Sequence, residues 1–271
     1  MANIKLQQGK TLSNQQICDL YKCSTQGGMR RSHRTKTLIL VSDYTRDLYE
    51  DRWDDNNIFH YTGMGQTGDQ SLDYSQNKTL YESDVNGVEV HLFQVYKSRE
   101  YIYQGIVNLA GEPYTERQLD KDKNERNVWV YPLNLIEVDV PAPISMDTLK
   151  EKQQRKEKAA KKLSLEELKN RARKPKPTSK RPAYSMQYTR DEHVKEYALH
   201  RANGRCELCE KSAPFKRKDG TPFLEVHHIQ WISRGGPDTI ENTVSLCPNC
   251  HKKMHILDIG SDKTKLESVA K

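Results

Sequence analysis

Four of the six cysteines lie in two Cys-x-x-Cys pairs, and this spacing is the clearest chemical signal in the chain. The pairs are Cys206/Cys209 and Cys247/Cys250. A two-residue turn lets both thiolates of a pair point at one ion, and four soft sulfurs suit a tetrahedral structural zinc. Disulfides are the alternative, but they are rare in proteins that are not secreted. We therefore expect structural Zn²⁺ on these four cysteines.

Histidines gather around the second cysteine pair. The 37 residues between the pairs include His227 and His228 in a short apolar run, and His251 and His255 follow Cys250. The pattern predicts a strand, a loop, a strand and a helix. Neighbours on a strand point to opposite faces, so one histidine of the first pair can bind a metal while the other faces substrate. Residues four apart on a helix share one face, as His251 and His255 do.

A structural zinc finger built from Cys206, Cys209, His251 and His255 is an alternative interpretation. Between Cys209 and His251 lie 41 residues, whereas about 12 are typical of that class. The finger would also leave the second cysteine pair and the first histidine pair unused. The spacing therefore disfavours it.

The stretch from about residue 186 to 258 resembles the HNH, or ββα-metal, nucleases, and most closely the McrA type of modification-dependent restriction endonuclease. The resemblance rests on the paired histidines, on the asparagine after them and on the second cysteine pair followed by helical histidines. It implies that His228 is the general base and that Asn242 orients it through the loop between the strands. It also implies that His227 and His251 hold a catalytic metal, which His255 faces as well, while zinc holds the domain together.

Phosphodiester hydrolysis suits this set of residues. The reaction needs a base that takes a proton from water and a cation that neutralises the departing oxygen, and neutral imidazole titrates near the operating pH. Imidazole ligands favour Mn²⁺, Co²⁺, Ni²⁺ or Zn²⁺ over Mg²⁺, and all five stay open as the catalytic metal. A degenerate module that binds without cutting is the alternative. Every motif position is filled, which favours catalysis.

Residues 1–140 are predicted to be mostly β structure. Runs rich in β-branched and aromatic residues suggest a sandwich or barrel, and they lie at 37–42, 88–96, 101–108 and 127–131. A short helix is expected over 13–21 with Ser13 as its cap. A loop opening at Gly27 is expected to carry five basic residues, either solvated or in contact with phosphates: Arg30, Arg31, His33, Arg34 and Lys36.

A G-x-G-x-x-G pattern starts at Gly63 and suggests a dinucleotide-binding loop. No apolar helix follows it, because residues 69–73 are polar, and nothing nearby is typical of a βαβ unit. We therefore reject a dinucleotide site.

The stretch from about residue 35 to 135 resembles the SRA (YDG) domain. The matching pieces are Tyr49 through Gly63, Asp69-Gln70 with Leu72, Asn77 to Leu80, and Tyr103-Gln104-Gly105 in place of Tyr-Asp-Gly. The resemblance implies recognition of 5-methylcytosine or 5-hydroxymethylcytosine, flipped out of the duplex into a pocket between aromatic rings.

The resemblance also implies which residues form that pocket. By position, Tyr49 and Tyr61 are the stacking tyrosines and Thr62 lies beside them. The cytosine-reading aspartate of the family falls on Arg52 here. We expect Asp51, or one of the aspartates at 54 and 55, to take its role. Ordinary core aromatics are the alternative interpretation of the two tyrosines.

Charge divides the 271 residues into three parts. The net charge is −4 over residues 1–140, +9 over 141–183 and +2 over 184–271. The middle part is rich in helix formers over 146–173, has a capping box at Ser164 and Glu167, and turns proline-rich over 174–182. We interpret it as a basic helical linker that can add contact with DNA. A second capping box at Thr189 and Glu192 is expected to start a helix that ends at Asn203.

Together these features predict an α+β protein. Its expected parts are an SRA-like β-barrel with flanking helices (1–140), the basic linker (141–183) and a zinc-stabilised HNH domain (184–271). Hydrophobic residues make up 35% of the chain and the mean hydropathy is −0.92. Apolar runs are far shorter than the roughly 18 residues of a membrane span, and the start lacks a signal-peptide core. A cytoplasmic protein without membrane contact is expected.

The expected function is a modification-dependent DNA endonuclease that restricts foreign DNA carrying modified cytosine. Double-stranded DNA is the expected partner. One HNH site cuts one strand, so we expect a homodimer, with two sequential events as the alternative. Two other functions stay open: a reader without catalysis whose zinc domain only stabilises binding, and a nuclease whose first domain reads a feature other than cytosine methylation.

Overall fold

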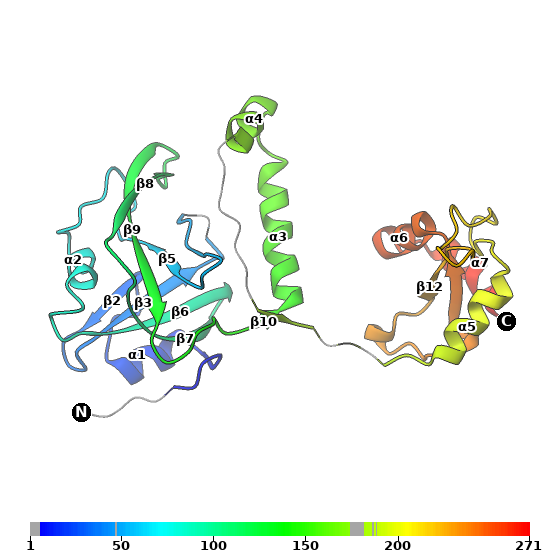
Figure 1. Ribbon diagram of the computed structural model, residues 1–271, viewed down its shortest axis with the longest axis horizontal. Helices are drawn as coiled ribbons and strands as arrows, with labels where there is room; N and C mark the ends of the chain where they lie inside the picture. The colour runs from blue at the N-terminus through cyan, green and yellow to red at the C-terminus, as the bar shows by residue number, and fades with distance from the viewer. Residues whose placement is uncertain (1–5, 47, 174–181, 186, 188) are drawn as a thin grey trace. The chain divides into compact units, whose positions relative to one another are not determined.

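The structure is a computed structural model of residues 1–271, and it describes residues 6–46, 48–173, 182–185, 187 and 189–271. The chain divides into two compact units, Met1–Ser185 and Met186–Lys271 (Figure 1). Each unit has its own buried apolar core. In the described part of the chain, no helix combines the length and the apolar composition that crossing a membrane requires.

The first unit is built on a mixed nine-stranded sheet with the order β2-β3-β6-β7-β9-β5-β4, to which β1 and β8 are attached at β7 and β9. The strands are β1 (Thr11–Leu12), β2 (Met29–Ser32), β3 (Thr37–Asp43), β4 (Arg52–Trp53), β5 (Phe59–Thr62), β6 (Glu89–Lys97), β7 (Glu100–Leu109), β8 (Tyr114–Leu119) and β9 (Glu125–Leu135). β3 and β6 are parallel, and the other neighbours are antiparallel.

The sheet confirms the predicted β structure but not its closure into a barrel. Among the described residues, β2 and β4 are the two ends of the path and do not pair with each other. These edge strands are only four and two residues long, so they offer few backbone groups for closure. The expected loop at Gly27 is also wrong in part. Its basic run enters the sheet as β2, where Arg30 is buried and donates to the Gly27 carbonyl and to Asn14.

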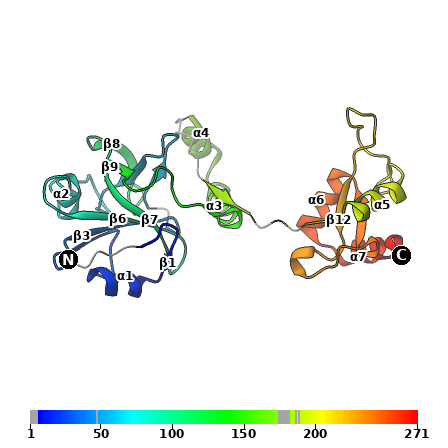
Figure 2. The ribbon, with the colours of Figure 1, turned by 60° about the horizontal axis from the view of Figure 1, so that its bottom comes forward.

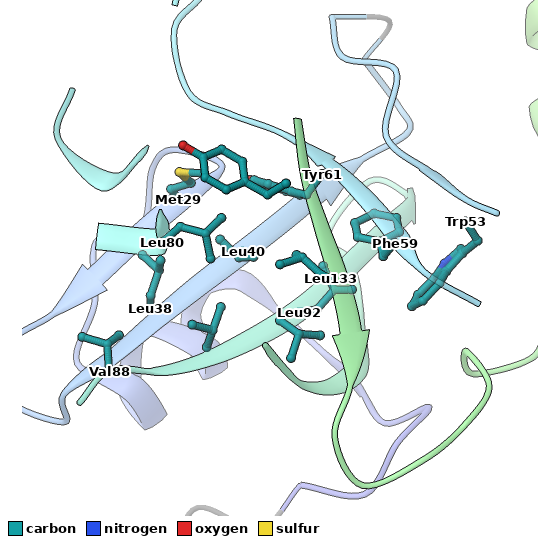
Figure 3. Close-up of a cluster of buried hydrophobic side chains, with 13 residues drawn as sticks. Met29, Leu38, Leu40, Trp53, Phe59, Tyr61, Leu80, Val88, Leu92 and Leu133 are labelled. Atoms are coloured by element: carbon teal, nitrogen blue, oxygen red, sulfur yellow. The ribbon is translucent and has the colours of Figure 1, made fainter. Parts of the chain in front are cut away.

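Both faces of this sheet are apolar, because alternate residues of β3 belong to different clusters. Leu38 and Leu40 pack with the side chains of β5 and β9 in one core (Figure 3). Ile39 and Val41 face a second core, which α1 (Asn14–Tyr21) covers with Ile17 and Tyr21 (Figure 2). Strands buried on both faces read as continuous apolar runs, as 37–41 does. α1 starts at the predicted Ser13 capping box, and α2 (Gln76–Tyr81) packs Leu80 against the first core.

The middle segment is helical, as predicted, but α3 is not a free tether. It contains β10 (Ile144–Ser145), α3 (Met146–Ala160), α4 (Leu165–Arg173) and β11 (Ala183–Tyr184). On α3, the Lys152 ammonium lies 3.6 Å from the centroid of the Tyr44 ring, and Arg155 donates to the Tyr96 carbonyl. Parallel pairing of β10 with β11 brings the chain back to the start of α3. Most of the predicted extended run over 174–182 falls outside the described residues.

The second unit contains the predicted strand, loop, strand and helix. Its elements are α5 (Glu192–Ala202), β12 (Glu225–His228), η1 (Ile232–Arg234), η2 (Ile240–Asn242), β13 (Thr243–Leu246), α6 (Pro248–Leu257) and α7 (Gly260–Ala270). β12 and β13 form an antiparallel pair. Asp191 caps α5 in place of the predicted Thr189, since its carboxylate accepts from the His193 backbone, and Asn203 ends the helix in the left-handed conformation.

Candidate active site and base pocket

The four cysteines of the two pairs come together at one point of the second unit. Their sulfurs all lie within 4.8 Å of one another, and the sulfurs of Cys209 and Cys247 are 4.0 Å apart. A tetrahedral zinc with bonds of about 2.3 Å needs sulfurs roughly 3.8 Å apart. Burial raises the pKa of the Cys247 and Cys250 thiols, whereas at Cys206 burial is outweighed by backbone hydrogen bonds, which lower the pKa of that thiol. A bound cation would stabilise all four thiolates together. The cluster therefore fits the structural zinc that the spacing predicts.

Three of the predicted histidines form a second cluster. Nitrogens of His227, His251 and His255 lie within 4.8 Å of one another, and the Nε2 atoms of His251 and His255 are 3.0 Å apart. β12 supplies the first ring, and α6 supplies the other two from one face. The Nε2 of His227 is buried with no hydrogen-bond partner. A buried imidazole nitrogen without a partner, facing two other rings, fits a divalent metal.

The charge state of these rings also suits metal binding. Burial, followed by the nearby His251 and His255, lowers the pKa of His227 to about 3. Burial and then His251 lower the pKa of His255 as well. Neutral imidazole is the form that ligates a metal. Glu225, which sequence reasoning did not single out, contacts the Nδ1 of His251. Such a carboxylate fixes the orientation of the ring and leaves Nε2 for the metal.

His228 lies apart from this cluster, as the alternation along a strand predicts. Its Nε2 is 2.7 Å from the Oδ1 of Asp238, a residue of the loop between β12 and β13. Hydrogen bonds from His228 and from the Asp191 backbone hold the pKa of Asp238 below its usual range. Sequence reasoning missed this residue. An aspartate after Gly-Gly-Pro is typical of a turn, where the carboxylate usually bonds to its own backbone.

Asn242 organises the loop and does not touch His228 directly. Its side chain donates to the carbonyls of Gln230 and Pro237 and accepts from the Gln230 backbone. Its own carbonyl accepts from the Ile229 backbone N–H. Asn242 thus joins the residues that follow His228 to the residue before Asp238 and so closes the loop between them.

In the first unit, the predicted pocket residues lie close together around Asp51. Asp51 accepts from the Thr62 backbone at 2.8 Å. Burial, opposed by the hydrogen bond from the Thr62 backbone, raises the pKa of Asp51 to about 6. Tyr49 and Tyr61 both have raised pKa values, first through burial and then with a contribution from the charge of Asp51. Asp51 therefore contacts Thr62, and its charge acts on both tyrosines.

The two tyrosines differ in accessibility. Tyr61 is 3% exposed, lies among the apolar side chains of the first core (Figure 3), and donates to the Gly28 carbonyl. Tyr49 is partly buried and donates to the Gly65 carbonyl. Arg126, missed by sequence reasoning, is 1% exposed, lies over the Tyr49 ring and donates to the same Gly65 carbonyl.

Arg52, which stands where the family has its cytosine-reading aspartate, is committed elsewhere. It forms an ion pair with Glu116 on β8 and also donates to the Tyr114 hydroxyl. Asp54 is used locally, because its carboxylate accepts from the backbones of Asn56 and Ile58. Of the aspartates considered as substitutes, Asp51 is the one that contacts Thr62 and whose charge acts on both tyrosines.

Comparison with known proteins gives two family matches. The profile described as "ScoMcrA-like, SRA domain" matches residues 8–156, and that of the HNH endonucleases matches residues 206–256. A stretch of 68 residues is 53% identical to the type IV methyl-directed restriction enzyme EcoKMcrA of Escherichia coli (strain K12), covering 25% of this chain and 24% of that protein.

Among solved structures, the type IV phosphorothioation-dependent restriction endonuclease ScoMcrA is 20% identical, with a TM-score of 0.41 over 98% of this chain and 63% of that one. The modification-dependent TagI restriction endonuclease is 18% identical, with a TM-score of 0.39 over 93% and 79%. The chain thus spans less than two thirds of the length of EcoKMcrA and of ScoMcrA. The profile match over more than half of its length identifies the chain as a member of the ScoMcrA-like SRA domain family that also carries an HNH endonuclease domain.

Proposed function

We propose that this protein is a modification-dependent type IV restriction endonuclease. In this proposal, residues 1–140 read modified cytosine in double-stranded DNA and residues 184–271 hydrolyse phosphodiester bonds, which restricts foreign modified DNA. The observation that carries the nuclease half is the cluster of His227, His251 and His255, with His228 directed away from it on the same strand.

The proposed roles follow from that placement. His227, His251 and His255 hold a divalent cation, which when bound neutralises charge on the phosphate and on the departing oxygen. His228 takes a proton from water, and the oxygen of that water attacks phosphorus. The P–O bond to the leaving oxygen breaks, and that oxygen takes a proton from solvent. Asn242 keeps the loop around His228 closed. The four cysteines hold structural zinc and so fix the start of α6, from which two of the imidazoles project.

For the reader we propose that Asp51 recognises the flipped base beside Tyr49, Tyr61 and Thr62. Two observations support this assignment. The Asp51 carboxylate contacts the Thr62 backbone and its charge acts on both tyrosines, while the Arg52 cation is paired with Glu116. Stacking on Tyr61 requires its ring to leave the core cluster when DNA binds. Because one HNH site cuts one strand, we propose a homodimer as the form that cuts a duplex.

A nuclease that reads another modification is the second candidate. The residue at the position of the usual cytosine-reading aspartate is an arginine here, and one relative is described as phosphorothioation-dependent. The reading step must therefore be tested against both base and backbone modifications.

The deciding experiment is cleavage of one duplex prepared in five forms: with cytosine, 5-methylcytosine, 5-hydroxymethylcytosine, its glucosylated form, or a phosphorothioate linkage. Each is incubated with Mg²⁺, Mn²⁺, Co²⁺, Ni²⁺ or Zn²⁺ and with wild type, His228→Ala or the control His200→Ala, which removes an exposed histidine of α5. We expect cleavage of methylated or hydroxymethylated duplexes alone, lost in His228→Ala and kept in His200→Ala.

The other outcomes separate the alternatives. Cleavage confined to the phosphorothioate duplex would show that the first domain recognises a modified backbone and not a modified cytosine. Equal cleavage of all duplexes would remove the reader while keeping the nuclease. Selective binding without cleavage under any metal would leave a reader without catalysis.

A further inference from the structure

The loop between β12 and β13 places one carboxylate against the candidate base. The Oδ1 of Asp238 lies 2.7 Å from the Nε2 of His228. Its Oδ2 accepts from the Asp191 backbone N–H at 2.6 Å. The side chain of His228 is 7% exposed and that of Asp238 is 23% exposed, so the contact is shielded from water on most sides.

The loop holds this carboxylate in place independently of His228. Asn242 donates to the carbonyl of Pro237, the residue directly before Asp238. Gly236 is packed so closely that a Cβ atom there would lie 2.0 Å from the Gln230 carbonyl oxygen. The Asp191 backbone fixes the second carboxylate oxygen from the start of α5. A carboxylate fixed at both ends can set the orientation of the ring it contacts.

We infer that Asp238 is the positioning residue of the base. It accepts the Nε2–H of neutral His228, which selects one tautomer and leaves the Nδ1 lone pair free to take the proton from water. This inference rests on the proposed function. In the proposed step one O–H bond of water breaks, the Nδ1–H bond forms, and the resulting imidazolium stays paired with the Asp238 carboxylate. Asp238 thereby performs the task that a buried carboxylate has in other carboxylate–histidine pairs.

Asp238 is separate from the metal ligands. Among the described residues, it belongs to neither of the two clusters whose atoms could share an ion. Its removal should therefore reduce the rate of the chemical step and leave metal and DNA binding intact. A residue that merely anchors α5 would instead lower stability and leave the rate of the folded protein unchanged.

The test compares Asp238→Ala and Asp238→Asn with wild type in the full chain. The control is Asp219→Ala, an aspartate of the same unit that bonds to Thr221 alone among the contacts described. The single-turnover rate is measured at saturating DNA and metal, on the duplex that wild type cleaves. We expect Asp238→Ala to lower it by about 10- to 100-fold. The cleavage rate should fall less in Asp238→Asn, because the amide oxygen still accepts the hydrogen bond from Nε2 of His228. Metal affinity by calorimetry, DNA affinity and the melting temperature should stay near wild type.

A double-mutant cycle tests whether Asp238 acts through His228. In the His228→Ala background, Asp238→Ala should cause no further loss. Three outcomes would overturn the inference. Asp238→Ala could keep full activity, or it could lower the cleavage rate equally in the wild-type and His228→Ala backgrounds. The cleavage rate could also fall only in proportion to a fall in the melting temperature.

The tautomer of His228 gives a readout that needs no cleavage. Nitrogen-15 NMR of the full chain should show the Nε2–H form of His228 in wild type and Asp219→Ala, and a mixture of tautomers in Asp238→Ala. If no duplex is cut but this difference is found, the proposed nuclease function fails while the positioning contact stands. If wild type cuts but the ring shows the Nδ1–H form, the nuclease stands and the positioning role of Asp238 is wrong.

Discussion

Asp51 is a carboxylate that the fold places among tyrosines and a buried arginine, where charge is costly. Its hydrogen bond from the Thr62 backbone offsets only part of the loss of hydration, and its pKa rises to about 6. In the folded state the group therefore keeps its proton up to about pH 6, whereas the unfolded chain releases it near 3.8. At neutral pH the folded protein therefore holds a negative charge on this partly buried carboxylate. In the proposed function that charge accepts a hydrogen bond from the amino group of the base.

This shift predicts the direction of a pH dependence. Between about pH 4 and 6 the folded state binds more protons than the unfolded state, so stability falls as pH rises and the loss is complete above pH 6. Asp51→Asn keeps the acceptor for Thr62 and removes the charge. We expect it to be more stable than wild type above pH 6, by at most about 3 kcal/mol, and equal to it at pH 4.

Thermal unfolding of the full chain from pH 4 to 8 measures this difference. The matched control is Asp73→Asn, which makes the same charge change on the surface. A constant difference between Asp51→Asn and wild type at every pH would refute the prediction. Selective binding of modified DNA should weaken in Asp51→Asn and not in the control.

At the scale of elements, the sequence is sufficient where one local pattern decides the structure. β3 and β6 follow from runs of β-branched residues, and α1 follows from the Ser13 capping box. The opposite faces of His227 and His228 follow from strand alternation alone. The two Cys-x-x-Cys motifs predict a common zinc ion, and from that ion it follows that the four cysteines lie close together.

Sequence patterns do not predict the structure where a contact between residues far apart in the chain determines it. β2 contains Arg30, whose charge argues for a loop, but the guanidinium is satisfied by Asn14 and by the Gly27 carbonyl. Thr189 and Asp191 both fit a helix cap, and the contact of the Asp191 backbone with Asp238, 47 residues away, favours the second. Asp238 itself contacts His228 only because of the path of the loop, which the sequence pattern does not encode.

That path depends on Gly236, and this gives a prediction at the level of the loop. An added Cβ at Gly236 would lie 2.0 Å from the Gln230 carbonyl oxygen, a backbone atom that cannot turn away. Gly236→Ala should therefore displace the loop that carries Asp238 and Asn242. It should lower the free energy of unfolding of the second unit by about 3 kcal/mol or more, as severe steric strain in a packed region does.

The neighbouring glycine is the control. A Cβ at Gly235 meets nothing within 4 Å, but its φ of +83° is strained for other residues. Gly235→Ala should lower the free energy of unfolding by only about 1 to 2 kcal/mol. Urea unfolding followed by the fluorescence of Trp231, which lies in the second unit, measures both. Equal costs for the two variants would contradict the packing argument.

The cysteine cluster predicts a coupling between metal and folding. Without a cation, four sulfurs would face one another at the junction of α6 with the rest of the unit, with little else to hold them. Cys250→Ser should remove about one zinc per chain and lower the unfolding midpoint of the second unit, while the first unit unfolds as in wild type. Zinc content by elemental analysis and a two-phase melt check this. The control is Cys23→Ser, a cysteine of the first unit.

At the scale of the whole molecule, the excess of positive charge is concentrated in the middle segment, residues 141–183. Residues 1–140 carry −4, whereas 141–183 carry +9 and leave their basic side chains on α3 and α4 largely exposed. In the proposed function, the net negative charge of residues 1–140 leaves the attraction to the phosphate backbone mainly to the basic middle segment. Sequence-independent affinity should therefore reside mainly in that segment.

This division predicts how salt dependence responds to mutation. Lys158→Gln on α3 combined with Lys169→Gln on α4 removes two exposed cations. If both contact phosphates, the slope of log affinity against log salt should become shallower by about 1.8, since each contact contributes roughly 0.9. The loss of binding affinity should be the same for modified and unmodified duplexes, because phosphate contacts carry no sequence information. The control, Lys10→Gln with Lys121→Gln, makes the same charge change within residues 1–140 and should leave the slope unchanged. Fluorescence anisotropy between 50 and 300 mM salt measures both pairs, and an equal change in slope for the two would place the phosphate contacts outside the middle segment.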